Sequence, residues 1–281
     1  MKKNALIILA VFFNLNLQAQ YFNMLSKYEN LDDFLIVDSA YFRCTYKLVY
    51  LKDTLKLNEK SEDIHVLLLG KNISKYYSQY TLDYNSFLKS YIKTHDNYPN
   101  NPNKGAWTYE LFKNYPLGKS TVADIASMLS GNFIYEEDPA IFNWKISSEI
   151  QKILSYSCQK AYMSFRGRNY EAWFTREIPI FNGPWKFGGL PGLIMKIADS
   201  KNNFIFECIG MEVLKEKEPI KFYKVPYSKV KKSELDKLYR RFHNDFKTYQ
   251  NMLGIKVEIR SAKNKPQNSA FKIPYNPIEL E

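Results

Sequence analysis

The sequence predicts a β-rich α+β protein whose main element is a twisted, half-barrel-like antiparallel sheet covered by a C-terminal helix. Two observations predict this class. Segments that alternate apolar and polar residues recur along the chain and are separated by turn-forming residues. Near the C-terminus the apolar spacing becomes helical, and such a helix can cover one face of a sheet. The abundance of aromatic residues, 22 Tyr and 19 Phe, agrees with a strand-rich chain.

The N-terminus has the pattern of a signal peptide over residues 1–19. Lys2 and Lys3 precede an apolar run at residues 5–13, and we expect cleavage after Ala19. The run is shorter than the roughly 20 residues of a membrane-spanning helix, and no later segment reaches that length without charge, so we predict no membrane span. We therefore expect an exported protein, periplasmic or extracellular, with an association with the outer membrane left open. Residues 20–281 should form a single β-rich domain.

The first half of the mature chain contains one clear strand and one hairpin. Residues 41–51 alternate more apolar with more polar side chains, as a half-buried strand does. Residues 63–70 and 74–80 predict two strands joined by a turn at residues 70–72. Residues 84–92 are compatible with a helix, and residues 96–105 are rich in Asn and Pro, which favour a loop.

Strand patterns become regular in the second half. They cover residues 133–135, 144–153, 161–165, 170–176, 193–198 and 204–214, with turn-like connections at residues 166–169 and 199–203. Consecutive strands with short connections predict an antiparallel meander.

The covering helix is predicted to begin at Ser233, with Asp236 in the capping position three residues later. Its apolar stripe follows at helical spacing and consists of Leu235, Leu238, Phe242, Phe246, Tyr249 and Leu253. A short strand at residues 255–260 is predicted before a tail rich in Pro and Asn.

Glycine and proline are concentrated in one block that we interpret as an architectural motif. It consists of Gly183 and Pro184, followed by Gly189, Leu190, Pro191, Gly192, Leu193 and Ile194. Because Gly allows positive φ and Pro fixes φ, the block predicts a tight turn or bulge that enters the strand at residues 193–198. Such a turn would let Trp185 or Phe187 fold over an edge or rim of the sheet.

Together with Trp144, Trp173 and the tail at residues 276–280, this block resembles the GLPGLI family of secreted proteins from Bacteroidetes-type bacteria. Residues 144–198 are the specific part of the resemblance, and residues 189–194 spell the hexapeptide in full. The resemblance implies secretion and a β-rich fold. It implies no molecular activity, because the function of the family is uncharacterised.

Charge and metal-binding residue types exclude several functions. The formal net charge is +11, but Lys and Arg are scattered and form no recognition pattern, so we predict no nucleic-acid partner. Cys44, Cys158 and Cys208 allow at most one intramolecular disulfide, and their spacing leaves the pairing open. With no CxxC pair and with histidines far apart in sequence, we predict no metal site, and we predict no cofactor.

No residue set predicts catalysis. No GxSxG nucleophile elbow accompanies the histidines, so a Ser-His-Asp site has no sequence support. A carboxylate pair is the alternative, since glycoside hydrolases hold a sugar between two carboxyl groups beside aromatic rings. Carboxylates are available in the acidic run Glu136, Glu137 and Asp138 and at Glu171 and Glu177, which flank Trp173. Examples of candidates for such a pair are Glu136, Glu171 and Glu177.

Four residues are candidates for ligand binding: Arg166, Arg168, Glu171 and Trp173. The two arginines lie at a hairpin tip, where guanidinium groups can hold a carboxylate or a phosphate, although a solvated turn has the same pattern. Glu171 and Trp173 fall on the same face of a strand, as residues of a surface or groove would.

We favour a non-enzymatic envelope protein that binds an apolar or amphipathic ligand, such as a lipid, or an outer-membrane protein. The reason is that the aromatic residues exceed what one covering helix would bury. The expected architecture also resembles the half-barrels of periplasmic lipoprotein carriers. Two alternatives are a hydrolase that uses carboxylates and an accessory subunit of an outer-membrane transporter.

Processing provides the first test. Expression in a bacterium that exports the protein should yield a chain that begins at Gln20, because the small side chain of Ala19 fits the cleavage position. The intact mass of the exported protein should equal that of residues 20–281. A mass that still includes residues 1–19 would contradict the predicted signal peptide.

Overall fold

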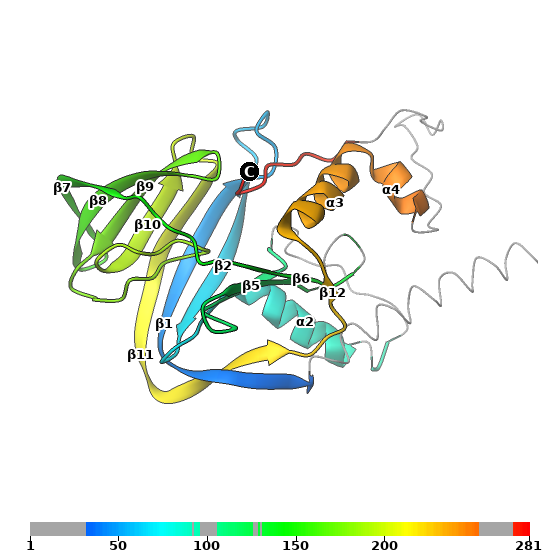
Figure 1. The fold of residues 1–281 in the computed structure, drawn as a ribbon, viewed down its shortest axis with the longest axis horizontal. Helices are drawn as coiled ribbons and strands as arrows, with labels where there is room; N and C mark the ends of the chain where they lie inside the picture. Colours follow the sequence, from blue (N-terminus) through cyan, green and yellow to red (C-terminus); the bar gives the residue numbers. More distant parts are fainter. Residues whose placement is uncertain (1–31, 92, 96–105, 126–128, 130, 253–271) are drawn as a thin grey trace, which may run out of the picture.

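The computed structural model describes residues 32–91, 93–95, 106–125, 129, 131–252 and 272–281. Within these residues the main element is one open, twisted sheet of twelve strands (Figure 1), which confirms the predicted β-rich class. The strand order is β12-β6-β5-β4-β3-β2-β1-β11-β10-β9-β8-β7. In this part of the chain all paired strands are antiparallel except β12 and β6, which are parallel.

The sheet consists of two meanders, in each of which consecutive strands are neighbours. The first contains β1 (Phe34–Leu51), β2 (Lys60–Leu69), β3 (Ser74–Ser78), β4 (Tyr109–Lys113), β5 (Ser120–Asp124) and β6 (Phe133–Glu137). The second contains β7 (Lys145–Ile153), β8 (Tyr156–Phe165), β9 (Arg168–Thr175), β10 (Leu193–Asp199) and β11 (Phe204–Tyr223). A short strand, β12 (Ser228–Lys229), then pairs with β6.

The two meanders join where β1 pairs with β11. These are the longest strands, with 18 and 20 residues, and their register runs from Phe34 opposite Tyr223 to Tyr50 opposite Phe204. Three register irregularities along this pair bend both strands. The pairing makes one continuous sheet from two halves that are far apart in sequence.

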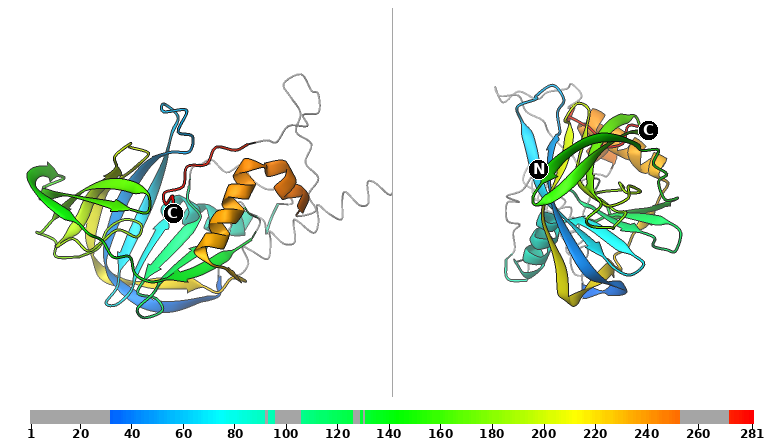
Figure 2. Two further views of the ribbon diagram at one scale, coloured as in Figure 1. Left: turned by 45° about the horizontal axis from the view of Figure 1, so that its top comes forward. Right: turned by 90° about the vertical axis from the view of Figure 1, so that its left-hand side faces the viewer.

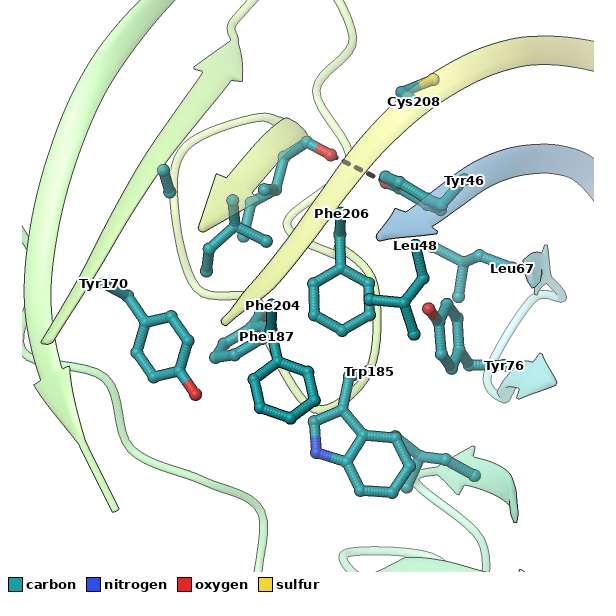
Figure 3. Packing of buried hydrophobic residues seen from close by; sticks show 14 of the residues in the cluster. Tyr46, Leu48, Leu67, Tyr76, Tyr170, Trp185, Phe187, Phe204, Phe206 and Cys208 are labelled. Carbon is teal, nitrogen blue, oxygen red and sulfur yellow. Dashed lines mark hydrogen bonds between the residues drawn. The ribbon is translucent and has the colours of Figure 1, made fainter. Parts of the chain in front are cut away.

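Alternation in β1 creates the inner face of the sheet. Cys44, Tyr46, Leu48 and Tyr50 are buried, whereas the residues between them are half-buried. The strand predicted at residues 41–51 is therefore confirmed, although it begins earlier, at Phe34. Its inner face packs against aromatic residues of other strands (Figure 3).

Helices lie on both faces of the sheet (Figure 2). The helix α2 (Gln79–Tyr91) places Leu82 against Val66 and Leu68, on the outer face of β2. The helices α3 (Lys232–Asn244) and α4 (Phe246–Met252) contribute their apolar residues to the core of the inner face. None of the helices among the described residues is long and apolar enough to cross a membrane.

The C-terminal helix differs from the prediction in its start and in its continuity. Lys231 precedes the first turn, and its backbone N–H donates to the Glu234 carboxylate at 3.1 Å. Glu234 therefore has the capping position that we predicted for Asp236. The helix ends at Asn244, and a second helix begins at Phe246. The apolar residues keep their helical spacing across this break, which is why the sequence predicts one continuous helix.

Several strands differ from their predicted extent. β4 and β5 occupy a region without a predicted element, because short strands buried on both faces have no alternation. β8 begins at Tyr156 and not at residue 161, and β11 continues to Tyr223 through a Lys- and Glu-rich stretch that hides its pattern. The predicted signal peptide at residues 1–19, the loop at 96–105 and the strand at 255–260 lie outside the described residues.

The loop between β9 and β10 carries the Gly/Pro motif and folds onto the inner face of the sheet. Trp185 and Phe187 are 3% and 0% exposed and fill the core (Figure 3), so they do not fold over a sheet edge or rim as predicted. Phe187 packs edge-on against Tyr170 of β9 and Phe206 of β11. The loop therefore supplies core side chains to a sheet that the helices cover only in part.

Lys113 of β4 fixes this loop to the first meander. Its Nζ donates to Asn182 Oδ1 and to the carbonyl oxygen of Phe187 at 2.7 Å, and to that of Gly183 at 3.1 Å. Burial lowers the pKa of Lys113 to about 7. Because the loop belongs to the second meander, these three hydrogen bonds connect the two halves of the sheet across its inner face.

Two positions in the motif require glycine. Gly189 has φ of 78°, which side chains rarely adopt. Gly192 has φ of 152°, and a Cβ there would lie 2.0 Å from the carbonyl oxygen of Thr175. The backbone of Gly192 thus packs directly against the end of β9.

The three cysteines are buried and unbonded. Cys44 and Cys208 lie on the neighbouring strands β1 and β11, and their Sγ atoms are 3.3 Å apart. Burial raises the pKa of Cys44. Among the pairings that the sequence left open, this is the one whose sulfur atoms the fold brings together.

One edge of the sheet is formed by β7, whose residues are mostly exposed. Its charged residues are Lys145, Glu149 and Lys152. Its pairing with β8 has an irregular register between Ile146 and Ile150. At the other edge lies β12, which has two residues.

Substitution of Gly192 tests the close approach of the β9–β10 loop to β9. Gly192→Ala should lower the free energy of unfolding by about 3 kcal/mol or more, because the new Cβ collides with a backbone oxygen. Gly210→Ala is the matched control: Gly210 lies in a strand and an added Cβ meets no atom within 4 Å. The control should change stability by less than about 1 kcal/mol. Equal urea-unfolding midpoints for the two variants would contradict this account.

Candidate functional site

A cavity of about 310 Å³ lies between the inner face of the sheet, α3 and residues 272–281, which we call the C-terminal segment. Figure 2 shows this segment in red, running from the side of α3 across the inner side of the sheet. Sheet strands and loops contribute Tyr50, Trp107, Tyr109, Trp185 and Phe204 to the lining. The volume falls at the lower end of the range for small-molecule sites, about 300–1,000 Å³.

Trp107 is the centre of the aromatic lining. Its ring centroid lies 5.4 Å from that of Trp185, 6.0 Å from Tyr50 and 6.2 Å from Phe204, each in an edge-to-face arrangement. Such pairs are favourable because the positive ring edge meets the negative ring face. The backbone N–H of Trp107 also donates to the buried Asp63 carboxylate at 2.8 Å. These contacts hold the aromatic surface in a fixed shape.

Stacked rings connect α3 to the C-terminal segment. The imidazole of His243 lies 4.4 Å from the ring of Tyr275, and the ring of Tyr239 lies 6.3 Å from Tyr275 on a nearly parallel plane. Burial lowers the pKa of His243, so its imidazole is neutral at neutral pH. The Tyr239 hydroxyl donates to Asp124 at the end of β5. This wall of the cavity is thus aromatic as well.

Charged side chains also line the cavity. Lys232 at the start of α3 lies 2.7 Å from the Asp236 carboxylate and 3.3 Å from that of Glu279. Lys52 follows β1, and burial lowers its pKa. Lys52, Lys232 and Asp236 are half-buried, so they belong to the part of the lining that meets solvent.

Glu279 anchors the C-terminal segment in an ionic cluster with Lys186, which is also buried, and with Arg166 and Glu137, which are half-buried. Lys186 Nζ lies 2.8 Å from Glu279 and 2.5 Å from Glu137, and Arg166 forms ion pairs with the same two carboxylates. The indole N–H of Trp185 donates to Glu279 at 3.0 Å. Burial alone would raise the pKa of Glu279, but the charges of Lys186 and Arg166 outweigh it and hold the pKa at about 2.

Arg168 binds the residues that precede Glu279. Its guanidinium group donates to Asn276 Oδ1 at 2.7 Å, to the Pro277 carbonyl at 2.5 Å and to the Ile278 carbonyl at 3.1 Å. It also pairs with Asp199 at 3.1 Å and is 7% exposed. These three donor contacts from Arg168 to residues 276–278 fix the segment as a wall of the cavity.

The structure brings Arg166 and Arg168 together at the C-terminal segment, whereas Glu171 and Trp173 lie elsewhere. Arg166 pairs with the carboxylates of Glu137 and Glu279, and Arg168 pairs with Asp199, so each arginine meets carboxylates of its own chain. The Trp173 indole donates to Glu171 at 3.1 Å, and Lys160 pairs with Glu171 at 3.0 Å. Glu171 and Trp173 are absent from the cavity lining among the described residues, and their binding role stays a prediction.

The carboxylates considered for hydrolysis make separate contacts. Glu171 pairs with Lys160, Glu177 accepts the backbone N–H of Ser157 at 2.8 Å, and Glu136 is exposed. None of the three belongs to the cavity lining in the described part of the chain. A glycosidase needs two carboxyl groups about 5–10 Å apart across a sugar. The cavity does not bring these three residues together as such a pair.

His65 lies in the core and not in the cavity lining among the described residues. Its Nε2 is 2.8 Å from Asp63 Oδ2, and the Ser78 hydroxyl donates to the other oxygen of Asp63 at 2.9 Å. In a catalytic triad the histidine stands between the serine and the carboxylate. Here the carboxylate stands between the serine and the histidine, so the arrangement is structural. Among the described residues, no three His, Cys, Asp or Glu side chains gather as they would around a metal ion.

Most residues of this site were not predicted from the sequence. Tyr50 was on the predicted inner face of its strand, and Tyr239 could have been found because it lies one helical turn after Leu235. Trp107 and Glu279 carry no local signal. Trp107 precedes a strand without alternation, and Glu279 meets Lys186 only through the tertiary fold.

The chain is similar to a family of unknown function over a short stretch, and its fold is distantly similar to solved structures. A family profile described as "Protein of unknown function (Porph_ging)" matches residues 165–196, which include the hexapeptide. The match overlaps the block on which the resemblance to the GLPGLI family rests, and the GLPGLI name itself stays a prediction. No curated protein matches the sequence.

Two solved structures of a protein named PNGF-II, in space groups P21 and C2, are similar to this chain at 15% identity and a TM-score of 0.47. The similar region covers 74% and 72% of this chain and 34% and 33% of those chains. This chain thus spans about a third of their length. A likeness this distant carries no argument about function.

The pH dependence of stability tests the ionic cluster. Glu279→Gln should lower the free energy of unfolding by about 3 kcal/mol at pH 7. The pKa of Glu279 is lower in the folded chain than the value of about 4.3 in an unfolded chain. Its contribution is therefore complete above that value and is lost as the pH falls towards 2, because the folded carboxylate must then be protonated.

Urea unfolding at pH 7 and pH 3 should accordingly show a smaller difference between wild type and Glu279→Gln at the lower pH. The exposed Glu216 provides the control, and Glu216→Gln should stay within about 0.5 kcal/mol of wild type at pH 7. An unchanged difference at the two pH values would show that the charge of Glu279 is not what anchors the segment.

Proposed function

We propose that the protein is a non-enzymatic binding protein that holds an amphipathic small molecule in the aromatic cavity. The observation that carries this proposal is the cavity of about 310 Å³ with aromatic rings on its sheet side, its helix side and its C-terminal wall. Small-molecule sites are typically concave and mostly apolar, with a few polar groups. The cavity has these properties.

The distribution of polar groups favours an amphipathic ligand over a purely apolar one. Trp107, Phe204 and Leu235 offer apolar surface, against which the body of a ligand would be removed from water. Lys52, Lys232 and Asp236 lie where the lining meets solvent and would contact a polar head group. A lipid or a similar molecule, with an aromatic or aliphatic body and a polar head group, matches both the apolar surface and the charged residues near solvent.

The place of action follows from the predicted signal peptide at residues 1–19. We propose that the protein works in the cell envelope, periplasmic or extracellular, where a soluble carrier protects an apolar molecule from water. The half-barrel sheet with an inner cavity supports this role. A role as an accessory subunit of an outer-membrane transporter stays a prediction, and no contact in the described residues favours it.

Filling the cavity tests the proposal. Ala106→Trp places an indole in the lining and should weaken binding of 1-anilinonaphthalene-8-sulfonate, an aromatic amphipathic anion, by at least tenfold, because the indole occupies the space of the probe. Fluorescence titration of the probe gives the Kd. Partly folded states with exposed apolar surface also bind this probe, so each titration is made well below the Tm of the variant.

Ala140→Trp is the matched control. Ala140 is half-buried, as Ala106 is, but it does not belong to the cavity lining. This variant should bind the probe within twofold of wild type. Equal affinity of wild type and the Ala106→Trp variant would mean that the probe binds elsewhere, and saturable binding by none of the proteins would remove support for a ligand cavity.

A further inference from the structure

The C-terminal segment lies on the sheet in the way that a bound peptide does. Its residues, 272–281, form no helix or strand and lie on the inner side of the sheet (Figure 2). The groups that hold residues 276–280 come from the turn between β8 and β9, from β9, from the β9–β10 loop and from the end of β1. We call the surface formed by Arg166, Arg168, Tyr170, Trp185 and Lys186 the tail groove.

The tail groove contacts both the backbone and the side chains of the segment. Arg168 donates to the carbonyl oxygens of Pro277 and Ile278, and the Tyr170 hydroxyl donates to the second of these at 3.1 Å. The Asn276 side chain accepts from Arg168 at 2.7 Å and donates to the Leu51 carbonyl at 2.7 Å. The backbone N–H of Leu280 donates to the Arg166 carbonyl at 3.0 Å.

A buried pocket for one carboxylate gives the groove its specificity. Glu279 is 8% exposed and meets two cationic side chains and one indole N–H in the groove. Replacing the carboxylate by an amide would leave Arg166 and Lys186 with less negative charge in a site where charges are costly. The groove therefore discriminates glutamate from glutamine.

The length of chain before the segment permits exchange between molecules. α4 ends at Met252 and the described chain resumes at residue 272. A fully extended chain as long as the intervening residues, 253–271, spans at most about 68 Å, at about 3.3–3.6 Å per residue. This is enough to place the segment in its own groove or in that of an adjacent molecule, which is the geometry of domain swapping.

We propose that the tail groove is a peptide-binding site for the sequence Asn-Pro-Ile-Glu-Leu, occupied in each molecule by residues 276–280, and that it accepts the same segment of a second copy of the chain. The proposal does not depend on a ligand in the cavity. The segment of the same molecule competes at an effective concentration on the order of millimolar, so binding in trans becomes visible when the segment in cis is weakened.

The experiment uses the full chain and a fluorescently labelled synthetic peptide with the sequence of residues 272–281. The Glu279→Gln chain has an intact tail groove and a weakened segment. It should bind the peptide saturably in a fluorescence anisotropy titration, at least tenfold more tightly than the wild-type chain does. A peptide with Gln in place of Glu279 should bind the same chain at least tenfold more weakly.

Two further variants separate the groove from non-specific effects. Adding Arg168→Gln to the Glu279→Gln chain should abolish saturable binding, because Arg168 supplies three of the contacts to the peptide. Asn276→Ala weakens the segment at a different residue and leaves Glu279 unchanged. This chain should also bind the labelled peptide more tightly than wild type.

The outcome that overturns the proposal is a folded Glu279→Gln chain, with the near-ultraviolet circular dichroism of wild type, that shows no saturable binding. Equal binding of the Glu and Gln peptides would overturn it as well. If the Glu279→Gln chain does not fold, the Asn276→Ala chain decides by the same titration. If neither folds, the peptide should restore the native spectrum of Asn276→Ala, and failure to restore it overturns the proposal.

Discussion

The ionic cluster of Arg166, Lys186, Glu137 and Glu279 is the interaction on which the inner side of the molecule depends. It joins β6, the β8–β9 turn, the β9–β10 loop and the C-terminal segment, which lie far apart in sequence. Buried charges are stable only when each has a partner of opposite sign. Loss of any one member therefore affects the other three, and the wall of the cavity with them.

The β9–β10 loop covers the part of the inner face of the sheet that the helices do not cover. An open sheet has an apolar inner face that must be covered, and α3 and α4 cover only part of it. The loop inserts Trp185 and Phe187 into the remaining space, and Lys113 holds it there through three oxygen atoms. The same Trp185 lines the cavity and donates to Glu279, so core, cavity and segment share one side chain.

The predictable part of this structure is the part that local patterns encode. Alternation in β1 and the helical stripe of α3 identify these two elements because each of them buries one face. Lys113, Trp107 and Glu279 have no such signal, since their partners are brought to them by the pairing of β1 with β11. The Gly/Pro motif lies between these cases: its backbone constraint at Gly192 could be predicted, whereas its position on the inner face required the fold.

An open sheet leaves two edges whose backbone groups can pair with another molecule, and this is the usual route to aggregation of β-rich proteins. At one edge the two-residue β12 offers almost no template. At the other, β7 carries Lys145, Glu149 and Lys152, and its irregular register disturbs the regular array of hydrogen-bonding groups. A strand that approached β7 would have to place its own residues beside these charges. The sheet can thus remain open around its cavity while its edge discourages fibril growth.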